Sequence, residues 1–403
     1  MLPATIFEMD MKVPSQRLLL TILVFLTALP LVSINIFLPS MPTIIDEFGG
    51  NVAAGVSTVS IYLAGVGIGQ LFYGPISDVY GRKISLVAGM SVFAVGSLIC
   101  TLAGSIELFL LGRFVQSFGA ASAIVIARIL ARDVYGSARA ASILGYTLTA
   151  ATVAAGLSPF AGGALDGMVG WRGVFATLVV AGVLMAVVCL IGVRDGILNR
   201  PLVRDRVNFA TVFAITRRPS FLMYALFSAC LFGSWQAFLA GVSIVVIGLW
   251  GYSQSEFSAW WLVVSLSYMV GTMIAGRYST IYGKLAMIGV GSILIVAGAS
   301  MLLAMALFDF RHPLGLFPPM SILLIGFGAA EPSAAAGALE ASPDRLGVAS
   351  AILGTMQVGF SILAISVVAY LPFHTALPLV SVSVGMALAA VALHYALRKV
   401  ASP

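Results

Sequence analysis

The chain has 403 residues, of which 60% are hydrophobic and 9% are charged, and its formal net charge is +6. Soluble domains carry about 25% charged residues. Together with a mean hydropathy of +1.08, this composition excludes a water-soluble globular protein and predicts a protein of the lipid bilayer.

Long apolar runs follow a polar start in which Glu8 and Asp10 argue against a cleavable signal peptide. A bilayer core of about 30 Å needs about 20 apolar residues in each helix, and helices are expected because a spanning segment must satisfy its own backbone hydrogen bonds. The sequence therefore predicts an all-α membrane protein. Its twelve predicted spans are 18–40, 54–74, 84–104, 107–130, 140–163, 173–193, 220–246, 257–277, 286–308, 316–338, 347–370 and 376–397.

Basic residues gather at alternate ends of these predicted helices. With the N-terminus in the cytoplasm, only Arg113, Arg172 and Arg311 of the 21 Lys and Arg fall in the outer half or outside. This is the positive-inside pattern. It predicts a multi-pass protein with both termini in the cytoplasm, and it accounts for the positive net charge without nucleic-acid binding.

The chain repeats itself at half its length. The segment "GQLFYGPISDVYGRK" (69–83) matches "GTMIAGRYSTIYGK" (271–284), with three glycines and one tyrosine recurring 202 positions apart. Parallel repeats of this kind build one large class of transporters. The predicted domains are two six-helix bundles, 1–193 and 219–403, joined by a cytoplasmic linker at 194–218.

Several motifs resemble those of the major facilitator superfamily. "GPISDVYGRK" is similar to its loop signature, "LGRFVQSFGAA" to its fourth-helix motif, and "YTLTAATVAAGLSPFAGGALDG" to the fifth-helix motif of its drug/proton antiporters. "FLPSMPTI", "ARDVYG" and "WRGVF" together look like the Bcr/CflA group of drug exporters. The resemblance covers essentially the whole chain. It implies the fold of this superfamily, two pseudo-symmetric six-helix bundles that normally work as a monomer.

The loop signature also has a physical reading. Gly74 and Gly81 are expected to allow close backbone contact and a sharp turn. Asp78 and Arg82 are four residues apart and can face the same side. In the family this cluster latches one conformation of importers and exporters alike, so it indicates the fold and not the direction of transport. Thr280 stands at the place of Asp78 in the second half, which predicts a weaker latch there.

The fifth-helix motif bears on direction. It places Pro159, Gly162 and Gly163 as the exporters do, whereas Ala154 and Ser158 replace two of their glycines. Small residues let helices approach closely, and a proline removes a backbone hydrogen bond. The motif favours export, and ordinary helix packing is the alternative.

Three charged residues lie clearly within apolar runs: Arg113, Arg128 and Glu331. A charge near a helix centre costs about 3 kcal/mol or more and by default marks a pathway or coupling site. The resemblance gives Arg113 a role in cavity polarity and proton coupling. Arg128 lies near the cytoplasmic side, where snorkelling towards water is the alternative.

Glu331 precedes Pro332 in the tenth predicted helix, among small residues. Burial disfavours an ionised carboxyl group, which suits Glu331 to carrying a proton. In this fold the fourth and tenth helices line the central cavity. We therefore hypothesise that Arg113 or Arg128 faces Glu331 and alternates with a proton as its partner. A static ion pair is the alternative.

A polar residue near the end of the first span departs from the family. Exporters of the Bcr/CflA group usually carry an aspartate shortly before "LP", and this chain has Asn35 there. An amide forms hydrogen bonds but carries no proton. Pro39 and Pro42 are expected to bend or end the helix at the outer surface. If coupling is retained, Glu331 is the candidate acid; if not, the protein is a facilitator.

The cavity is expected to suit an apolar or aromatic compound held by a few polar groups. Because Arg113 and Arg128 counter Glu331, a neutral or zwitterionic small molecule is favoured over a dication. The predicted cavity residues are Asn35, Tyr62, Tyr146, Tyr224, Trp235, Gln236, Met356 and Gln357.

Three functions compete. The first is proton-driven export of drugs or small organic molecules across a bacterial inner membrane, by rocking of the two bundles. The second is an uncoupled facilitator or proton-symport importer of a small metabolite, and the third is a lipid flippase. No enzyme is predicted, because no set of nucleophile and base appears and no phosphate-binding loop for ATP is present. Cys100, Cys189 and Cys230 lack ligand spacing, so no metal or other cofactor is expected besides the proton gradient.

Overall fold

The computed structural model describes residues 16–49, 52–193, 209–342, 346–372 and 374–401. Every regular element in these ranges is helical. The first part of the chain forms α1 (Gln16–Asn35), η1 (Leu38–Ser40), α2 (Met41–Glu47), α3 (Val52–Tyr80), α4 (Arg82–Leu102) and α5 (Ile106–Gly192). The second part forms α6 (Phe209–Thr216), α7 (Pro219–Ser243), η3 (Ile244–Leu249), α8 (Gln254–Tyr282), α9 (Lys284–Leu307), η4 (Pro313–Gly315), α10 (Phe317–Glu340), α11 (Leu346–Tyr370) and α12 (Leu377–Ala401).

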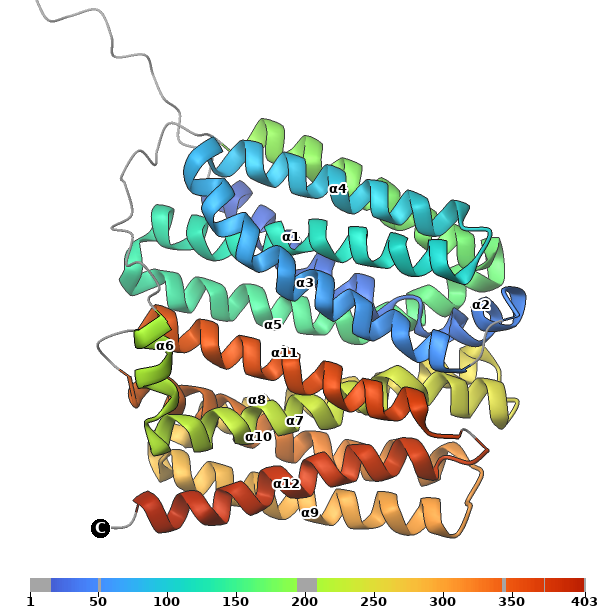
Figure 1. Ribbon diagram of the computed structural model, residues 1–403, viewed down its shortest axis with the longest axis vertical. Coiled ribbons are helices and arrows are strands. Elements are labelled where there is room, and N and C mark those ends of the chain that lie inside the picture. The colour runs from blue at the N-terminus through green and yellow to red at the C-terminus, as the bar shows by residue number, and fades with distance from the viewer. Residues whose placement is uncertain (1–15, 50–51, 194–208, 343–345, 373, 402–403) are drawn as a thin grey trace, which may run out of the picture.

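Eleven stretches of the described chain are long and apolar enough to cross a membrane, against twelve predicted spans. The counts differ because Ile143–Gly192, with 50 residues, is one stretch where the sequence predicts two spans. At 1.5 Å per residue a straight helix of this length would measure about 75 Å, more than twice the roughly 30 Å of the bilayer core. The backbone instead breaks at Gly170, where φ is +72°, and α5 runs as separate teal and green rods (Figure 1). This stretch therefore has the length of two crossings.

The helices form two groups that lie side by side (Figure 1). In the first group α1, α3 and α4 all pack on α5, and in the second group α10 packs on α8 and α9 while α12 packs on α7. The groups meet where α3 contacts α11 and where α5 contacts α8. Residues 194–208 of the predicted linker lie outside the described residues, and 209–216 form α6. The domain limits stay a prediction.

The internal repeat extends to the backbone. Gly81 begins α4 with φ +88° and ψ 159°, and Gly283 begins α9 with φ +81° and ψ 164°. This region of backbone conformation is essentially restricted to glycine. The helices that precede them, α3 and α8, each have 29 residues. The sharp turn predicted at Gly81 is confirmed, and the second half repeats it.

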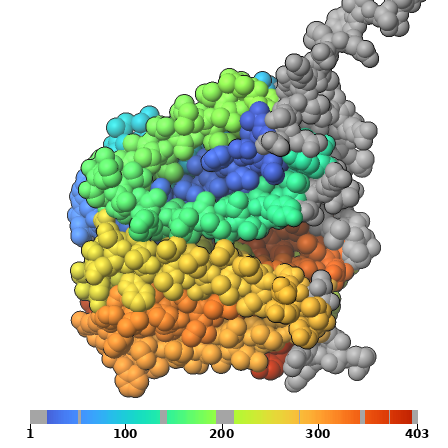
Figure 2. Space-filling view, turned by 180° about the vertical axis from the view of Figure 1, so that it is seen from behind, coloured from blue at the N-terminus to red at the C-terminus, as the bar shows by residue number. Residues whose placement is uncertain are grey.

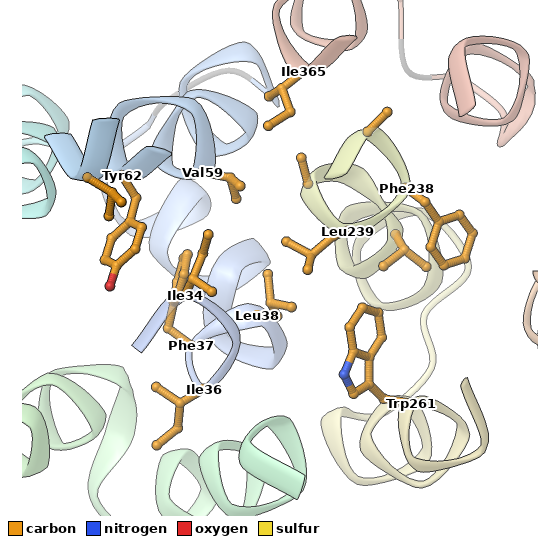
Figure 3. Packing of buried hydrophobic residues seen from close by; sticks show 14 of the residues in the cluster. Ile34, Ile36, Phe37, Leu38, Val59, Tyr62, Phe238, Leu239, Trp261 and Ile365 are labelled. Carbon is orange, nitrogen blue, oxygen red and sulfur yellow. The ribbon is translucent and has the colours of Figure 1, made fainter. Parts of the chain in front are cut away.

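The two groups are joined at the end opposite the basic loops. Ser258 Oγ of α8 donates to the Pro159 carbonyl oxygen of α5 at 3.1 Å, and Ser243 Oγ lies 3.8 Å from the Met41 sulfur. Figure 3 shows Leu38, just beyond α1, pointing towards Leu239 of α7. Figure 2 shows the green α5 meeting the yellow α8 from behind. The positive-inside pattern predicts that this closed end is the outer one.

The end of α1 follows the predicted pattern. The helix stops at Asn35, and the following 3₁₀ turn and short helix hold Pro39 and Pro42 near their starts. The missing N–H of a proline costs least at the start of a helix. The first helix thus breaks beside these prolines, as the sequence predicts, and the buried Leu38 lies at the interface between the groups.

Candidate functional site

Glu331 lies where three helices of the second group meet. Its Oε1 accepts hydrogen bonds from Ser228 Oγ of α7 at 3.2 Å and from Gln357 Nε2 of α11 at 3.3 Å. Gln357 Nε2 also donates to Ser228 Oγ at 2.8 Å. Ser228 is buried, whereas Glu331 and Gln357 are partly exposed. The carboxyl group of this partly exposed residue is therefore held by neutral groups.

A small residue lets α10 pack closely against α8. An ideal Cβ added at Gly328 of α10 would lie 2.6 Å from the Tyr268 carbonyl oxygen of α8, so only glycine fits there. Pro332 lies inside α10, one turn after Gly328, and has no backbone N–H to donate. Glu331 thus lies about one helical turn from a close contact between α10 and α8.

Arg113 occupies a separate site in the first group and has no exposed surface. Its Nη1 donates to Gln116 Oε1 at 2.5 Å and to the Ser33 carbonyl oxygen at 3.2 Å. Gln116 Nε2 in turn donates to Ser97 Oγ at 2.8 Å. The Nε and Nη2 atoms of Arg113 have no hydrogen-bond partner among the described residues. A buried guanidinium therefore lacks a carboxylate here.

Aromatic rings surround this guanidinium. Its Cζ lies 4.3 Å from the centre of the Phe37 ring, 4.5 Å from that of Tyr62 and 5.8 Å from that of Phe175. A cation over an aromatic face gains about 2 kcal/mol or more when both are desolvated. Tyr62 also donates to the Pro30 carbonyl oxygen at 2.9 Å and shares a short hydrogen bond with Ser33. Tyr62 is thus buried against Arg113, and Figure 3 shows Tyr62 and Phe37 in this part of the first group.

The structure does not join the predicted arginines to Glu331. No ion pair links Glu331 to a basic side chain within the part of the chain that the structure describes. Arg128 has an exposed side chain. Asn35 is 8% exposed, and its Nδ2 donates to the Leu31 carbonyl oxygen of its own helix at 2.7 Å. The hypothesis of an Arg–Glu331 pair finds no contact in this conformation.

The other predicted cavity residues are spread over several environments. Tyr146 is 70% exposed, and Trp235 packs against Trp261 with ring centres 5.4 Å apart. Tyr224 lies against α10, since a Cβ at Gly337 would be 2.7 Å from its ring. Met356 packs near Tyr224, and Gln236 is buried. Of the predicted set, the structure brings only Gln357 to Glu331.

The loop signature forms a compact ionic cluster. Arg82 Nη1 lies 2.6 Å from Asp78 Oδ1, and its Nε lies 3.8 Å from Asp133 Oδ2 of α5. The pairing expected between Asp78 and Arg82 is therefore present. The close backbone approach expected at Gly74 is wrong, because an added Cβ there would meet no atom within 4 Å.

The fifth-helix motif packs directly against other helices. A Cβ at Gly162 would lie 1.7 Å from the Ile36 carbonyl oxygen, and one at Gly163 would lie 2.7 Å from Ser258 Oγ. Gly167, four residues after Gly163, has open space around an added Cβ. Positions 162 and 163 at the closed end thus leave no room for a Cβ atom, which explains why both are glycine.

Comparison with known proteins identifies the family. The sequence profile of the Major Facilitator Superfamily matches residues 23–365. The chain belongs to the major facilitator superfamily. It is therefore a multi-pass membrane protein of a family of secondary transporters, not of enzymes, and it acts on small molecules.

Relatives place it near drug-resistance proteins of this superfamily. It is 26% identical over 360 residues to a bicyclomycin resistance protein homolog of Haemophilus influenzae, covering 88% of this chain and 89% of that protein. It is 26% identical over 350 residues to a chloramphenicol resistance protein of Pseudomonas aeruginosa, covering 86% and 82%. The predicted resemblance to the Bcr/CflA group is confirmed.

The fold agrees with solved transporters of the superfamily. A bacterial homolog of the human lysosomal transporter Spinster, in an inward-facing and occupied conformation, matches with a TM-score of 0.71 and 16% identity. The match covers 96% of this chain and 97% of that structure. The prediction of the fold is confirmed.

Two polar residues of these sites were missed in the sequence. Gln116 lies three residues after Arg113, and residues at this spacing share a helix face, so the pattern contained a usable signal. The sequence around Ser228 contained no such signal, because serine is frequent in membrane helices. Only the packing of α7 against α10 and α11 shows its contact with Glu331.

Proposed function

We propose that this protein exports drugs or other small organic molecules by proton antiport, with Glu331 as the group that carries the proton. The observation that carries the proposal is that the carboxyl group of Glu331, a partly exposed residue, is held by Ser228 and Gln357 without a basic partner in the described chain. Such a carboxyl group can gain and lose a proton without breaking an ion pair. The drug-resistance relatives support the choice of substrate class.

The transport cycle follows from two alternating conformations. The bundles 1–193 and 219–403 rock about the linker 194–218, and the contacts at the outer end open while the cytoplasmic end closes. Outside, Glu331 takes up a proton as substrate leaves; inside, it releases the proton as substrate enters. One proton moving down about 150 mV supplies roughly 3.5 kcal/mol, which supports accumulation of several hundredfold.

The proposal includes the location, the oligomeric state and the substrate class of the protein. The protein lies in a bacterial inner membrane with both termini in the cytoplasm, as its basic loops indicate, and it works as a monomer. Its substrate is a neutral or zwitterionic small molecule. Arg113 contributes a fixed positive charge within the first bundle, and Arg128 lies exposed towards the cytoplasmic side.

Asn35 favours a second candidate, the uncoupled facilitator. Its amide occupies the place where Bcr/CflA exporters usually carry an acid, and its hydrogen bond goes to its own helix. A chain that has lost the titratable group of the first helix can still alternate between conformations. It would then equilibrate its substrate without moving protons.

Proton movement in proteoliposomes tests the two functions. A pH-sensitive dye inside the vesicles reports proton flux while a panel of neutral and zwitterionic antibiotics is added to wild type, Glu331→Gln and Asn35→Asp. Antiport predicts substrate-induced flux in wild type that Glu331→Gln abolishes. Substrate movement without proton flux in wild type, with flux appearing in Asn35→Asp, would support the facilitator and contradict antiport.

A further inference from the structure

Two neighbouring arginines before α7 lie in different surroundings. Arg218 Nη1 donates to the Ala341 carbonyl oxygen at the end of α10 at 2.7 Å and to Ser342 Oγ at 3.4 Å. Arg217 is exposed, and its Cζ lies 4.2 Å from the centre of the Phe213 ring of α6. In the described parts of the chain, the Arg217 guanidinium has no hydrogen bond or ion pair. Arg218 therefore holds α7 to α10, whereas the donors of Arg217 are available to a ligand.

The short helix α6 has apolar residues on two opposite faces. Ile215 is 2% exposed and packs in a cluster with Phe221 of α7 and Leu353 of α11. Phe213, two residues earlier, is 57% exposed. Residues two apart are separated by about 200° around an α-helix, so Phe213 lies on the side of α6 opposite the packed face. Arg217 follows Phe213 by four residues and shares its outward side.

α6 lies at the level of the membrane surface. The membrane-spanning stretch of α7 begins at Pro219, two residues after Arg217. Figure 1 shows α6 at the same end of the molecule as the end of α12, and the positive-inside pattern predicts that this end is cytoplasmic. Lipid headgroups border the hydrocarbon core, so Arg217 lies near the phosphates of the cytoplasmic leaflet. At this boundary an apolar ring can enter the acyl region while a basic side chain stays among the headgroups.

We propose that Arg217 and Phe213 form a binding site for an anionic phospholipid of the cytoplasmic leaflet, with the guanidinium bound to the lipid phosphate and the ring against the start of the acyl chains. A guanidinium donates two parallel hydrogen bonds to a phosphate, and its contact with the Phe213 ring holds it in place. The negative surface potential of this leaflet comes from acidic lipids, which basic residues attract. The exposed ring favours a lipid over a free phosphate ion, because an inorganic ion has no apolar part to bury. The site is separate from Glu331 and does not depend on proton antiport.

Native mass spectrometry of the purified full-length protein in a neutral detergent measures the binding of added lipids. Dioleoylphosphatidylglycerol and dioleoylphosphatidylcholine have the same chains, so they differ only in the headgroup. The wild type should bind the first phosphatidylglycerol about tenfold more tightly than the first phosphatidylcholine, and Arg217→Gln should remove most of this preference, the range expected for a lost hydrogen bond to a charged group.

Arg311→Gln is the matched control for the arginine. Arg311 is an exposed arginine at the opposite end of the molecule, where it is paired with Asp309, so its variant should keep the lipid preference of the wild type. Absence of the preference in the wild type, the same preference in Arg217→Gln, or an equal loss in Arg311→Gln overturns the proposal.

A second pair of variants tests the apolar part of the site without altering its charge. Phe213→Ala should weaken phosphatidylglycerol binding about fivefold, because part of the lipid loses its apolar contact. Phe308→Ala is the control, since Phe308 is 82% exposed at the opposite end, and it should bind as the wild type does. Glycerophosphoglycerol, the same headgroup without acyl chains, should not displace the lipid when added at the same concentration. Displacement, or unchanged binding in Phe213→Ala, would indicate a site for a free anion and overturn the proposal of a lipid site.

Discussion

Ser258 of α8 donates a hydrogen bond to the carbonyl oxygen of Pro159 of α5, at 3.1 Å. The bond joins the two helix groups beside Gly162 and Gly163, and Ser265 makes a similar contact with the Gly156 carbonyl oxygen at 3.4 Å. Pro159 and Gly163 of the fifth-helix motif thus lie at a contact between the two halves. Opening the outer end must separate these atoms.

The first prediction concerns the outer closure. Gly163→Val should prevent it, because the added Cβ would lie 2.7 Å from Ser258 Oγ of the other helix group. Leu239→Cys, in a background without the three native cysteines, reports access from outside, since Leu239 is 1% exposed in the closed state. A membrane-impermeant maleimide should label it at least about tenfold faster in the Gly163→Val protein, which corresponds to a shift of about 1.4 kcal/mol.

Gly167→Val is the control for this experiment. An added Cβ at Gly167 meets no atom within 4 Å, so labelling should stay at the wild-type rate. Equal labelling of the two valine variants would mean that the contact at Gly163 does not hold the outer end closed.

The second prediction compares two arginines. Gln116→Leu should lower the free energy of unfolding by about 1.5–3 kcal/mol, because the buried Arg113 loses a hydrogen bond to a charged group. Arg172→Ala should lower it by no more than about 1 kcal/mol, because its ion pair with Glu47 is solvent-exposed, with side chains 41% and 40% exposed. Unfolding in mixed detergent micelles measures both. A larger loss for Arg172→Ala would contradict the importance of the buried cluster.

The third prediction concerns the two repeated turns. Gly81→Ala and Gly283→Ala should each destabilise the protein by about 1–3 kcal/mol, because φ near +80° and ψ near 160° strain any residue with a Cβ. Asn should not rescue either position, since it tolerates only the left-handed helical region. At Gly49, where φ is +57°, Asn should be nearly neutral. The midpoint of thermal unfolding checks the series, and rescue by Asn at Gly81 would refute it.

The fourth prediction concerns the ionic cluster around Arg82. Asp78 and Arg82 are in direct contact at 2.6 Å, so a double-mutant cycle of Asp78→Asn and Arg82→Gln should give a coupling energy of about 0.5–3 kcal/mol. The same cycle with Asp133→Asn should give a smaller value, because that carboxylate lies 3.8 Å away. Additive losses for Asp78 and Arg82 would show that the contact contributes nothing to stability.

Much of the fold could be predicted because lipid imposes strong rules. The need for about 20 apolar residues in each span and the repeat at Gly81 and Gly283 located the helices and both sharp turns. The turn at Gly170 followed from the same rules, because Asp166 and Arg172 flank it and interrupt the apolar residues. The predicted spans at 140–163 and 173–193 leave this turn between them.

The candidate site was less predictable. The sequence singled out Arg113, Arg128 and Glu331 as charges within the spans, and it suggested that one of the two arginines faces Glu331. The structure instead surrounds Arg113 with Phe37 and Tyr62 and gives Glu331 neutral neighbours. Contacts between distant helices depend on how each helix is rotated, and periodicity in strongly apolar helices carries little information on rotation.

The joint between the helix groups has one further consequence. Its hydrogen bonds in the described chain end on neutral atoms, the carbonyl oxygens of Pro159 and Gly156 and the sulfur of Met41. Dissolved ions weaken attractions between charges and leave contacts of this kind largely unaffected. Opening and closing of the outer end should therefore not depend on ionic strength.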